Sequence, residues 1–223
     1  MSQARAKPEH RVISHAGFRG LYAVTPDEPD IGLLARKVSK ALAGGARIVQ
    51  YRNKSASAGL RREQGAALLA LCREARIPLV INDDLDLASR IGADGLHLGR
   101  DDMPLAAARA QLGKDKLLGA SCYDRLELAL AAREAGADYV AFGSAFPSAT
   151  KPGATRAPLS LYREAKGRLS SPVVAIGGIT TENARAVIEA GSDAVAVISA
   201  LFDAPDIEAV ARSFSRLFDT KNP

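Results

Sequence analysis

The sequence has no tryptophan, two cysteines and few aromatic residues, and each of these shortages excludes a class of protein. Aromatic residues make up 5% of the chain, and none are interleaved with basic residues as a platform for single-stranded nucleic acid requires. Cys72 and Cys122 form neither a CxxC pair nor a disulfide framework, so we expect reduced thiols. No apolar run approaches the roughly 20 residues of a membrane helix, and the polar segment 1–19 lacks the apolar centre of a signal peptide. We therefore expect a soluble, cytoplasmic protein with no membrane partner.

The net charge of +5 is concentrated in one short segment. Residues 1–19 contain four basic residues and one acidic residue, which leaves +2 for the other 204 residues. We predict a flexible basic tail over 1–19 and a catalytic domain over 20–219. A nucleic-acid-binding protein led by this tail is one alternative, and it predicts salt-sensitive binding that disappears when residues 1–19 are removed. The weak basic excess of the remaining chain instead favours a small polyanionic substrate and no nucleic-acid partner.

Short apolar runs alternate with helical stretches along the whole chain. The runs are rich in valine and isoleucine, as parallel strands buried on both faces are, and they cover Leu21–Thr25, Ile48–Arg52, Leu79–Asp83, Gly95–Gly99, Leu117–Ser121, Tyr139–Gly143, Val173–Gly177 and Ala194–Ser199. Between them lie Ala/Leu/Arg/Glu segments with helical spacing, such as Ala58–Ala75. Eight β-then-α units in about 200 residues predict an α/β fold of one domain, the (β/α)8 TIM barrel, near its lower size limit.

A repeated glycine signature supports the barrel independently. The pattern small–Gly–small–polar precedes the second, fourth, sixth and eighth predicted strands, and its copies are Gly44-Gly45-Ala46-Arg47, Ile91-Gly92-Ala93-Asp94, Ala135-Gly136-Ala137-Asp138 and Ala190-Gly191-Ser192-Asp193. The aligned glycines are spaced by 47, 44 and 55 residues. Each glycine can end a helix in the left-handed conformation before the chain enters a strand. Two βα units per repeat is the period of a barrel whose strands contribute alternate layers.

Charged side chains gather at the ends of the predicted strands, where the active sites of such barrels lie. Arg52, Lys54 and Lys151 supply three cations from two loops. They suit a diphosphate, because arginine binds its oxygens in pairs and lysine adds a mobile point charge. Asp83 and Asp102 follow neighbouring strands. Because carboxylates and cations in one cavity would partly cancel, we expect a Mg²⁺ ion and a polyanion between them.

The last two predicted strands end in a second group suited to phosphate. Gly177-Gly178 precede a helix that begins near Thr180, and Ser199 precedes Ala200. Backbone N–H groups at such positions bind a phosphate monoester, and the loops after strands seven and eight are the usual phosphate site of this fold. One cavity would then hold a diphosphate with its metal ion at one side and a monophosphate at the other. The natural chemistry is displacement of diphosphate by a phosphorylated nucleophile.

The motifs at these positions resemble those of the thiamine phosphate synthase family from about Gly20 to Phe218. The resemblance rests on Gln50-Tyr51-Arg52-Asn53-Lys54, Asn82-Asp83, Ala93–Gly99 with Asp102, the Pro147–Lys151 loop and Ala175–Ile179. It implies an enzyme that joins 4-amino-2-methyl-5-pyrimidinylmethyl diphosphate to thiazole phosphate or its carboxylate, releases diphosphate and forms thiamine phosphate. The implied mechanism is dissociative: diphosphate leaves first and the pyrimidine methylene carries transient positive charge. The protein then needs no covalent nucleophile, and its work is to neutralise charge on the leaving group and to align the thiazole nitrogen.

The resemblance also assigns roles residue by residue. Asp83 and Asp102 would hold Mg²⁺. The pyrimidine diphosphate would be bound by Gln50, Arg52, Lys54, Asn82, Ser121 and Lys151, and the thiazole phosphate by Ser148, Thr150, Gly178, Ile198 and Ser199. The catalytic roles would fall to Arg52, Lys54, Ser121 and Lys151. Tyr123 stands where many members have histidine, and Ser148 stands where threonine is usual but keeps the hydroxyl.

Other residues near these motifs have simpler interpretations. We expect His97 to be packed or hydrogen-bonded in the barrel interior, because no second histidine accompanies it. Asp84, Asp86 and Asp101 are expected to cap helices or remain exposed, and Cys122 to fill the core.

A related barrel isomerase, a thiazole tautomerase, is the second alternative function. It would bind the monophosphate without needing the metal or the diphosphate machinery, so the combination of Arg52, Lys54, Lys151 and the two aspartates favours the synthase. We expect small-molecule substrates as the partners. The Ala-rich outer helices are compatible with a homo-oligomer.

Overall fold

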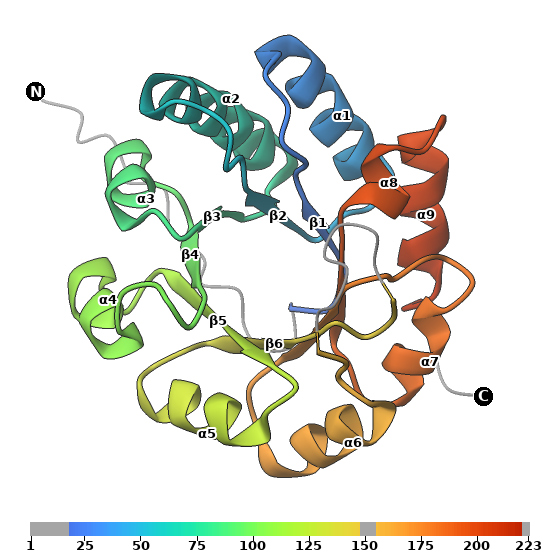
Figure 1. Ribbon diagram of the computed structural model, residues 1–223. Coiled ribbons are helices and arrows are strands. Elements are labelled where there is room, and N and C mark those ends of the chain that lie inside the picture. Colours follow the sequence, from blue (N-terminus) through green and yellow to red (C-terminus); the bar gives the residue numbers. More distant parts are fainter. Residues whose placement is uncertain (1–17, 148–154, 220–223) are drawn as a thin grey trace, which may run out of the picture.

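Eight parallel strands close into a barrel, and helices surround it in chain order (Figure 1). The computed structural model describes residues 18–147 and 155–219. Its strands are β1 (Gly20–Val24), β2 (Ile48–Tyr51), β3 (Leu79–Asn82), β4 (Gly95–Leu98), β5 (Leu117–Tyr123), β6 (Tyr139–Phe142), β7 (Val173–Ile176) and β8 (Ala194–Val197). Its helices are α1 (Ile31–Ala43), α2 (Ala58–Ala75), α3 (Leu85–Ile91), α4 (Leu105–Leu112), α5 (Leu126–Glu134), α6 (Leu159–Arg168), α7 (Ala184–Glu189), α8 (Ser199–Phe202) and α9 (Ile207–Arg216).

The predicted (β/α)8 barrel is therefore confirmed. Each strand pairs with the next one in the chain, and β1 closes the ring by pairing with β8. All eight predicted strands form, with ends that differ by at most two residues. Two strands differ by two residues: β8 ends at Val197, and β5 continues to Tyr123 across a register shift after Ser121. Such irregularities generally bend a strand, and this one directly follows Ser121, a predicted site residue.

Alternation along the strands divides the core into two parts. Residues that face outward pack against the helices, and these include Leu21, Tyr51 and Leu96. Residues that face inward fill the barrel itself, and these include Tyr22 and Tyr139. The second group makes the barrel a packed core with a site above it rather than an open pore.

The floor of the barrel contains a residue from the segment predicted as a tail. Phe18 is only 2% exposed, and its ring centre lies 4.5 Å from that of Tyr139 and 6.2 Å from that of Tyr22. The other residues of that segment, except Arg19, lie outside the described ranges. Phe18 thus belongs to the barrel core, and stacking within this aromatic cluster stabilises the floor.

The glycine repeat has a structural role at the amino ends of the strands. The aligned glycines Gly45, Gly92, Gly136 and Gly191 all have positive φ, between 72° and 111°. In three copies the aspartate then accepts a hydrogen bond from an N–H at the start of the preceding strand. Asp94 accepts from Leu79, Asp138 from Leu118, the second residue of β5, and Asp193 from Val173. The repeat therefore ties neighbouring βα units together on the face of the barrel opposite the predicted site.

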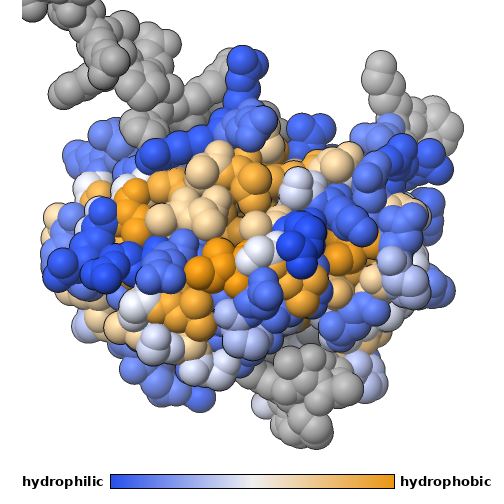
Figure 2. Space-filling view, turned by 90° about the horizontal axis from the view of Figure 1, so that it is seen from above, coloured by the Kyte–Doolittle hydropathy of each residue, from blue (hydrophilic) through white to orange (hydrophobic). Residues whose placement is uncertain are grey.

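The outer surface is of mixed character. On the side shown in Figure 2, hydrophobic residues form patches that hydrophilic residues surround. Within residues 18–147 and 155–219, no helix is both long and apolar enough to cross a membrane.

Candidate active site

The carboxyl ends of β2, β3 and β4 bring the predicted cations and carboxylates together. Lys54 follows β2, and its Nζ atom lies 3.5 Å from Oδ2 of Asp83, the residue after β3. Asp102 lies in the loop after β4 and neighbours Asp83. Parallel pairing places these strand ends at one edge of the barrel, as the sequence predicts.

The two aspartates form a half-buried carboxylate pair. Burial, together with the neighbouring Asp102 carboxylate, raises the pKa of Asp83, and the Lys54 ammonium partly opposes this rise. Asp102 is held in place because its Oδ2 accepts a hydrogen bond of 2.6 Å from the N–H of Gly99. Asp83 has φ of 62°, a left-handed conformation that is uncommon for a non-glycine residue and typical of functional sites.

This pair fits a divalent cation. A positive ion between two adjacent carboxylates would relieve the repulsion that raises the pKa of Asp83. Mg²⁺ is commonly held by one or two carboxylates plus substrate oxygens and water. Among the described residues, no group of three or more His, Cys, Asp or Glu side chains is placed to enclose a metal ion. Two carboxylates alone would leave coordination positions for substrate oxygens and water.

Asp27 belongs to the candidate site by its contacts, and the sequence analysis did not select it. Its Oδ1 accepts a hydrogen bond of 3.0 Å from the N–H of Lys54 and lies 3.4 Å from Nη1 of Arg52. Thr25 binds the same segment, since its hydroxyl donates to the Arg52 carbonyl and accepts from the Arg52 N–H, both at 2.9 Å. The loop after β1 thus binds the backbone of Arg52 and Lys54 and contacts the Arg52 guanidinium. An aspartate in a polar loop gives no periodic signal that would have identified it.

A small cavity extends this site toward α2. It measures about 70 Å³ and is lined by Lys54, Arg61, Asn82 and Asp83, among others. Arg61 lies in the first turn of α2 and approaches Asp84 at 4.0 Å. Sequence analysis did not select Arg61, because an arginine at a helix start is usually a solvated charge.

The flanking aspartates behave as the simpler interpretation predicts. Asp84 caps α3 by accepting a hydrogen bond of 2.9 Å from the Leu87 N–H. Asp86 forms an exposed ion pair with Arg90. Asp101 has a 91% exposed side chain.

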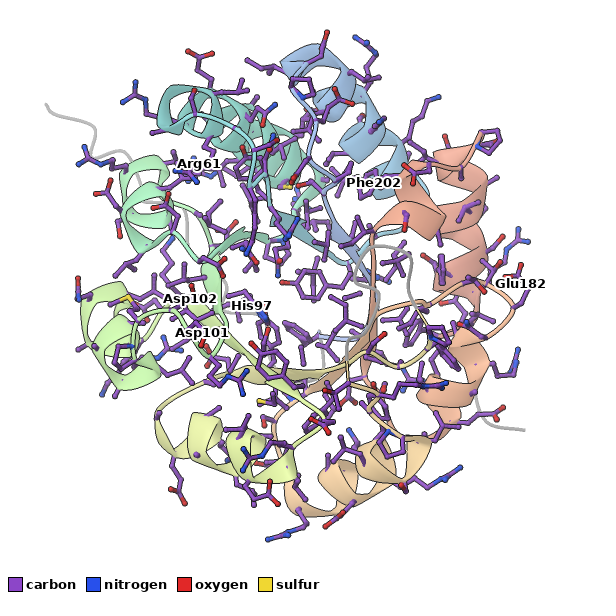
Figure 3. All side chains as sticks on the ribbon, in the orientation of Figure 1. Arg61, His97, Asp101, Asp102, Glu182 and Phe202 are labelled. Carbon is purple, nitrogen blue, oxygen red and sulfur yellow. The ribbon has the colours of Figure 1, made fainter. Side chains whose placement is uncertain are left out.

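Beneath the mouth of the barrel, Gln50 and Ser121 are joined by a buried hydrogen-bonded chain. Gln50 bonds to Tyr22, Tyr22 to Tyr139, Tyr139 to His97 and His97 to Ser121, with distances between 2.8 and 3.0 Å. Figure 3 shows His97 inside the ring of strands, with Asp102 near it. Burial lowers the pKa of His97 to about 4, so its ring is neutral at neutral pH. The expected place of His97 in the barrel interior is confirmed.

The ends of β7 and β8 form the second predicted group. Gly178 follows β7 with φ of 63°, and a Cβ there would lie 2.3 Å from the Pro147 carbonyl oxygen. Ile198 directly follows β8 and Ser199 begins α8. The N–H groups of Gly178, Ser199 and Ala200 donate no backbone hydrogen bond to any described residue. These donors at adjacent strand ends suit the oxygens of a phosphate.

Three predicted site residues, Ser148, Thr150 and Lys151, lie outside the described residues. The segments that flank them are joined at Ser144 at the end of β6. Its N–H donates to the Thr155 carbonyl at 3.0 Å, and its own carbonyl accepts from the Ala157 N–H at 2.9 Å. Ala145 and Phe146 then bond to Ile176 and Gly177, which places the start of this loop against the end of β7.

Fold and site together define a (β/α)8-barrel enzyme that presents cations, a carboxylate pair and backbone amides at the carboxyl ends of its strands. A sequence model of the family described as thiamine monophosphate synthase matches residues 21–201. The chain belongs to this family. It is accordingly a transferase of thiamine biosynthesis.

Individual relatives agree with the family assignment. The chain is 55% identical over 203 residues to a thiamine-phosphate synthase of Thioalkalivibrio sulfidiphilus, covering 91% of this chain and 96% of the relative. It is 56% identical over 202 residues to a thiamine-phosphate synthase of Methylobacillus flagellatus, with 91% and 96% covered. Among solved structures, a thiamine phosphate pyrophosphorylase from Pyrococcus furiosus superposes with a TM-score of 0.82 at 35% identity, over 91% of this chain and 96% of that one.

Proposed function

We propose that this chain condenses the aminopyrimidine diphosphate with thiazole phosphate or its carboxylate, and releases diphosphate and thiamine phosphate. The observation that carries the proposal is the contact of Lys54 with Asp83, at 3.5 Å, beside Asp102. Asp27 joins Arg52 to the same segment. Cations and carboxylates gathered at one edge of the barrel suit a polyanion with a bound metal ion. The relatives' name supports the same reaction.

Mg²⁺ is the proposed cofactor, with Asp83 and Asp102 as the residues that would hold it. When bound, the ion would supply positive charge to the departing diphosphate. Arg52 and Lys54 would bind the diphosphate oxygens, with Asp27 contacting the Arg52 guanidinium and the Lys54 backbone N–H. Their charges stabilise the leaving group most when its bond to carbon is nearly broken, which is the condition for faster reaction.

The other proposed contacts hold the two reactants in line. Gln50, Asn82 and Ser121 would bind the pyrimidine, and Lys151 would complete the diphosphate site from the loop after β6. Gly178, Ile198 and Ser199, with Ser148 and Thr150 of that loop, would hold the thiazole phosphate. A dissociative reaction needs no covalent nucleophile, so the protein aligns the thiazole nitrogen with the pyrimidine methylene and keeps the leaving group bound.

A thiazole tautomerase is the second candidate function, and the carboxylate pair argues against it because an isomerase of a monophosphate needs no such site. The proposal requires no nucleic-acid partner and is compatible with a homo-oligomer. It includes a cytoplasmic location, since Cys72 and Cys122 are buried free thiols as expected in a reducing compartment.

The test incubates pure protein with both substrates and Mg²⁺ and measures thiamine phosphate. The proposal expects sustained product formation, and it expects Lys151→Ala to lower turnover by orders of magnitude with an unchanged circular dichroism spectrum. A parallel assay of thiazole phosphate isomerisation identifies the tautomerase. Folded protein that isomerises the thiazole and forms no thiamine phosphate would overturn the proposal.

A further inference from the structure

The buried chain of hydrogen bonds between Gln50 and Ser121 has a fixed direction. Gln50 Nε2 donates to the Tyr22 hydroxyl at 2.9 Å, and the only other side-chain partner of that hydroxyl among the described residues is Tyr139, at 2.8 Å. A buried O–H group requires an acceptor, because leaving it unpaired costs about 1–3 kcal/mol. The Tyr22 proton therefore points to Tyr139.

The remaining hydrogen bonds, from Tyr139 to Ser121, run in the same direction. Since the Tyr139 oxygen accepts from Tyr22, its own proton goes to Nδ1 of His97, which lies 3.0 Å away. The neutral imidazole then carries its proton on Nε2 and donates it to the Ser121 oxygen at 2.9 Å. The Ser121 proton is thus directed away from the histidine.

The two ends of the chain consequently present opposite groups to the mouth of the barrel. Gln50 uses its Nε2 on Tyr22, so its Oε1 remains as an acceptor; Oε1 forms no hydrogen bond with another described residue. Ser121 accepts from His97, so its O–H remains as a donor. Reversing the direction of these hydrogen bonds would require the Gln50 amide to turn and every later donor to become an acceptor. Each hydroxyl and the imidazole accept one hydrogen bond and donate one, so their directions change together.

An aminopyrimidine is complementary to this arrangement. Its exocyclic amino group is a donor that matches Gln50 Oε1, and its ring nitrogens are acceptors that match the Ser121 O–H. The oxo counterpart has the reverse pattern, with an exocyclic acceptor and a ring N–H. We propose that Tyr22, Tyr139 and His97 are positioning residues that fix the direction of these hydrogen bonds and so make the site select an aminopyrimidine over an oxopyrimidine. This inference rests on the proposed function.

Tyr139→Phe interrupts the chain of hydrogen bonds at its middle and so tests its role. The substitution removes the hydroxyl that transmits the direction and keeps the ring that packs on Phe18. Tyr162→Phe is the matched control, because Tyr162 is also fully buried and donates to the Phe142 carbonyl at 3.0 Å without joining the chain. Both variants lose one buried hydroxyl, so a purely structural effect would be similar in the two.

The kinetic measurement is the ratio of kcat/KM for the amino substrate to that for its oxo analogue, in the presence of Mg²⁺. We expect a ratio on the order of 10³ or more for the unchanged protein, since a site that binds polar groups rejects a mismatched analogue strongly. Tyr139→Phe should lower the ratio at least tenfold, chiefly through KM for the amino substrate, and Tyr162→Phe should not. Equal ratios in the two variants would overturn the proposal.

A second measurement does not depend on the reaction. Nitrogen-15 NMR of histidine-labelled protein at neutral pH, with the His97 signals assigned by His97→Asn, reports which ring nitrogen carries the proton. The proposal requires the Nε2–H tautomer, and the Nδ1–H tautomer would overturn it. Unchanged protein that shows the Nε2–H tautomer yet forms no thiamine phosphate would contradict the proposed function while leaving the direction of the chain established.

Discussion

Lys54 and Asp83 link the ends of two neighbouring strands, with Nζ of the lysine 3.5 Å from Oδ2 of the aspartate. The lysine ammonium favours the charged form of the aspartate, because it opposes the rise in pKa that burial and Asp102 impose on Asp83. In the proposed reaction the metal ion and the diphosphate would enter between these groups. Substitution of either residue therefore tests the proposed reaction.

Asp83→Asn should reduce kcat/KM by on the order of 10²–10³-fold, because it removes one of the two proposed metal-binding carboxylates. Asparagine tolerates the left-handed φ of 62° at this position, so the backbone should keep its conformation. The Mg²⁺ concentration for half-maximal activity should rise. Asp86→Asn, which alters only an exposed ion pair, is the control. Full activity in Asp83→Asn at low Mg²⁺ would contradict the assignment.

Asp27→Ala should raise KM for the pyrimidine diphosphate by roughly tenfold, since the Arg52 guanidinium and the Lys54 backbone N–H both lose the carboxylate that they contact. Asp27→Asn keeps an oxygen that can accept from the Lys54 N–H and should have a smaller effect. Steady-state kinetics of the two variants separate loss of charge from loss of the backbone contact. A larger effect of asparagine than of alanine would contradict this role.

Gly178→Ala should weaken binding of the thiazole phosphate and lower the melting temperature. The added Cβ would lie 2.3 Å from the Pro147 carbonyl oxygen, and φ of 63° costs a non-glycine residue roughly 1 kcal/mol. The strand-end loops must shift to accommodate it. Gly167→Ala is a suitable control because nothing lies within 4 Å of a Cβ there. Equal KM and melting temperature in the two variants would refute the close approach of Gly178 to Pro147.

Asp138→Ala should lower the free energy of unfolding by about 1–3 kcal/mol, because the Leu118 N–H and the Arg109 guanidinium lose a charged acceptor. This contact lies at the amino ends of the strands, away from the site. Urea unfolding gives the change in stability, and kcat/KM of the folded variant should be unchanged. Loss of activity with native stability would show that this face has a catalytic role.

The two thiols should not react in the folded protein. Burial raises the pKa of Cys72 and of Cys122 to about 12, so almost no thiolate is present at neutral or mildly alkaline pH. Ellman's reagent at pH 8 should label no cysteine in native protein and two in urea. Rapid labelling of native protein would show that one of these side chains is accessible.

Features that depend on residues close together in the sequence are predicted correctly. The apolar strand segments and the glycine repeat are patterns of residues close together in the sequence, and they are sufficient to predict the barrel. The parallel strands of that barrel then bring Lys54 and Asp83 to one edge. Contacts between inward-facing residues cannot be predicted from such local patterns, because the residues are far apart in the sequence. Tyr22 and Tyr139 are 117 residues apart and meet only because the closed barrel turns both inward. Asp27 was missed for a similar reason, since its partners lie on another loop.

The most direct test of the account measures diphosphate and thiamine phosphate together in one reaction with pure protein. The account predicts that the two products form in equal amounts, that EDTA abolishes both, and that added Mg²⁺ restores both. Formation of thiamine phosphate that persists in EDTA would contradict the metal-assisted reaction, and failure of the folded protein to form it with Mg²⁺ present would contradict the synthase itself.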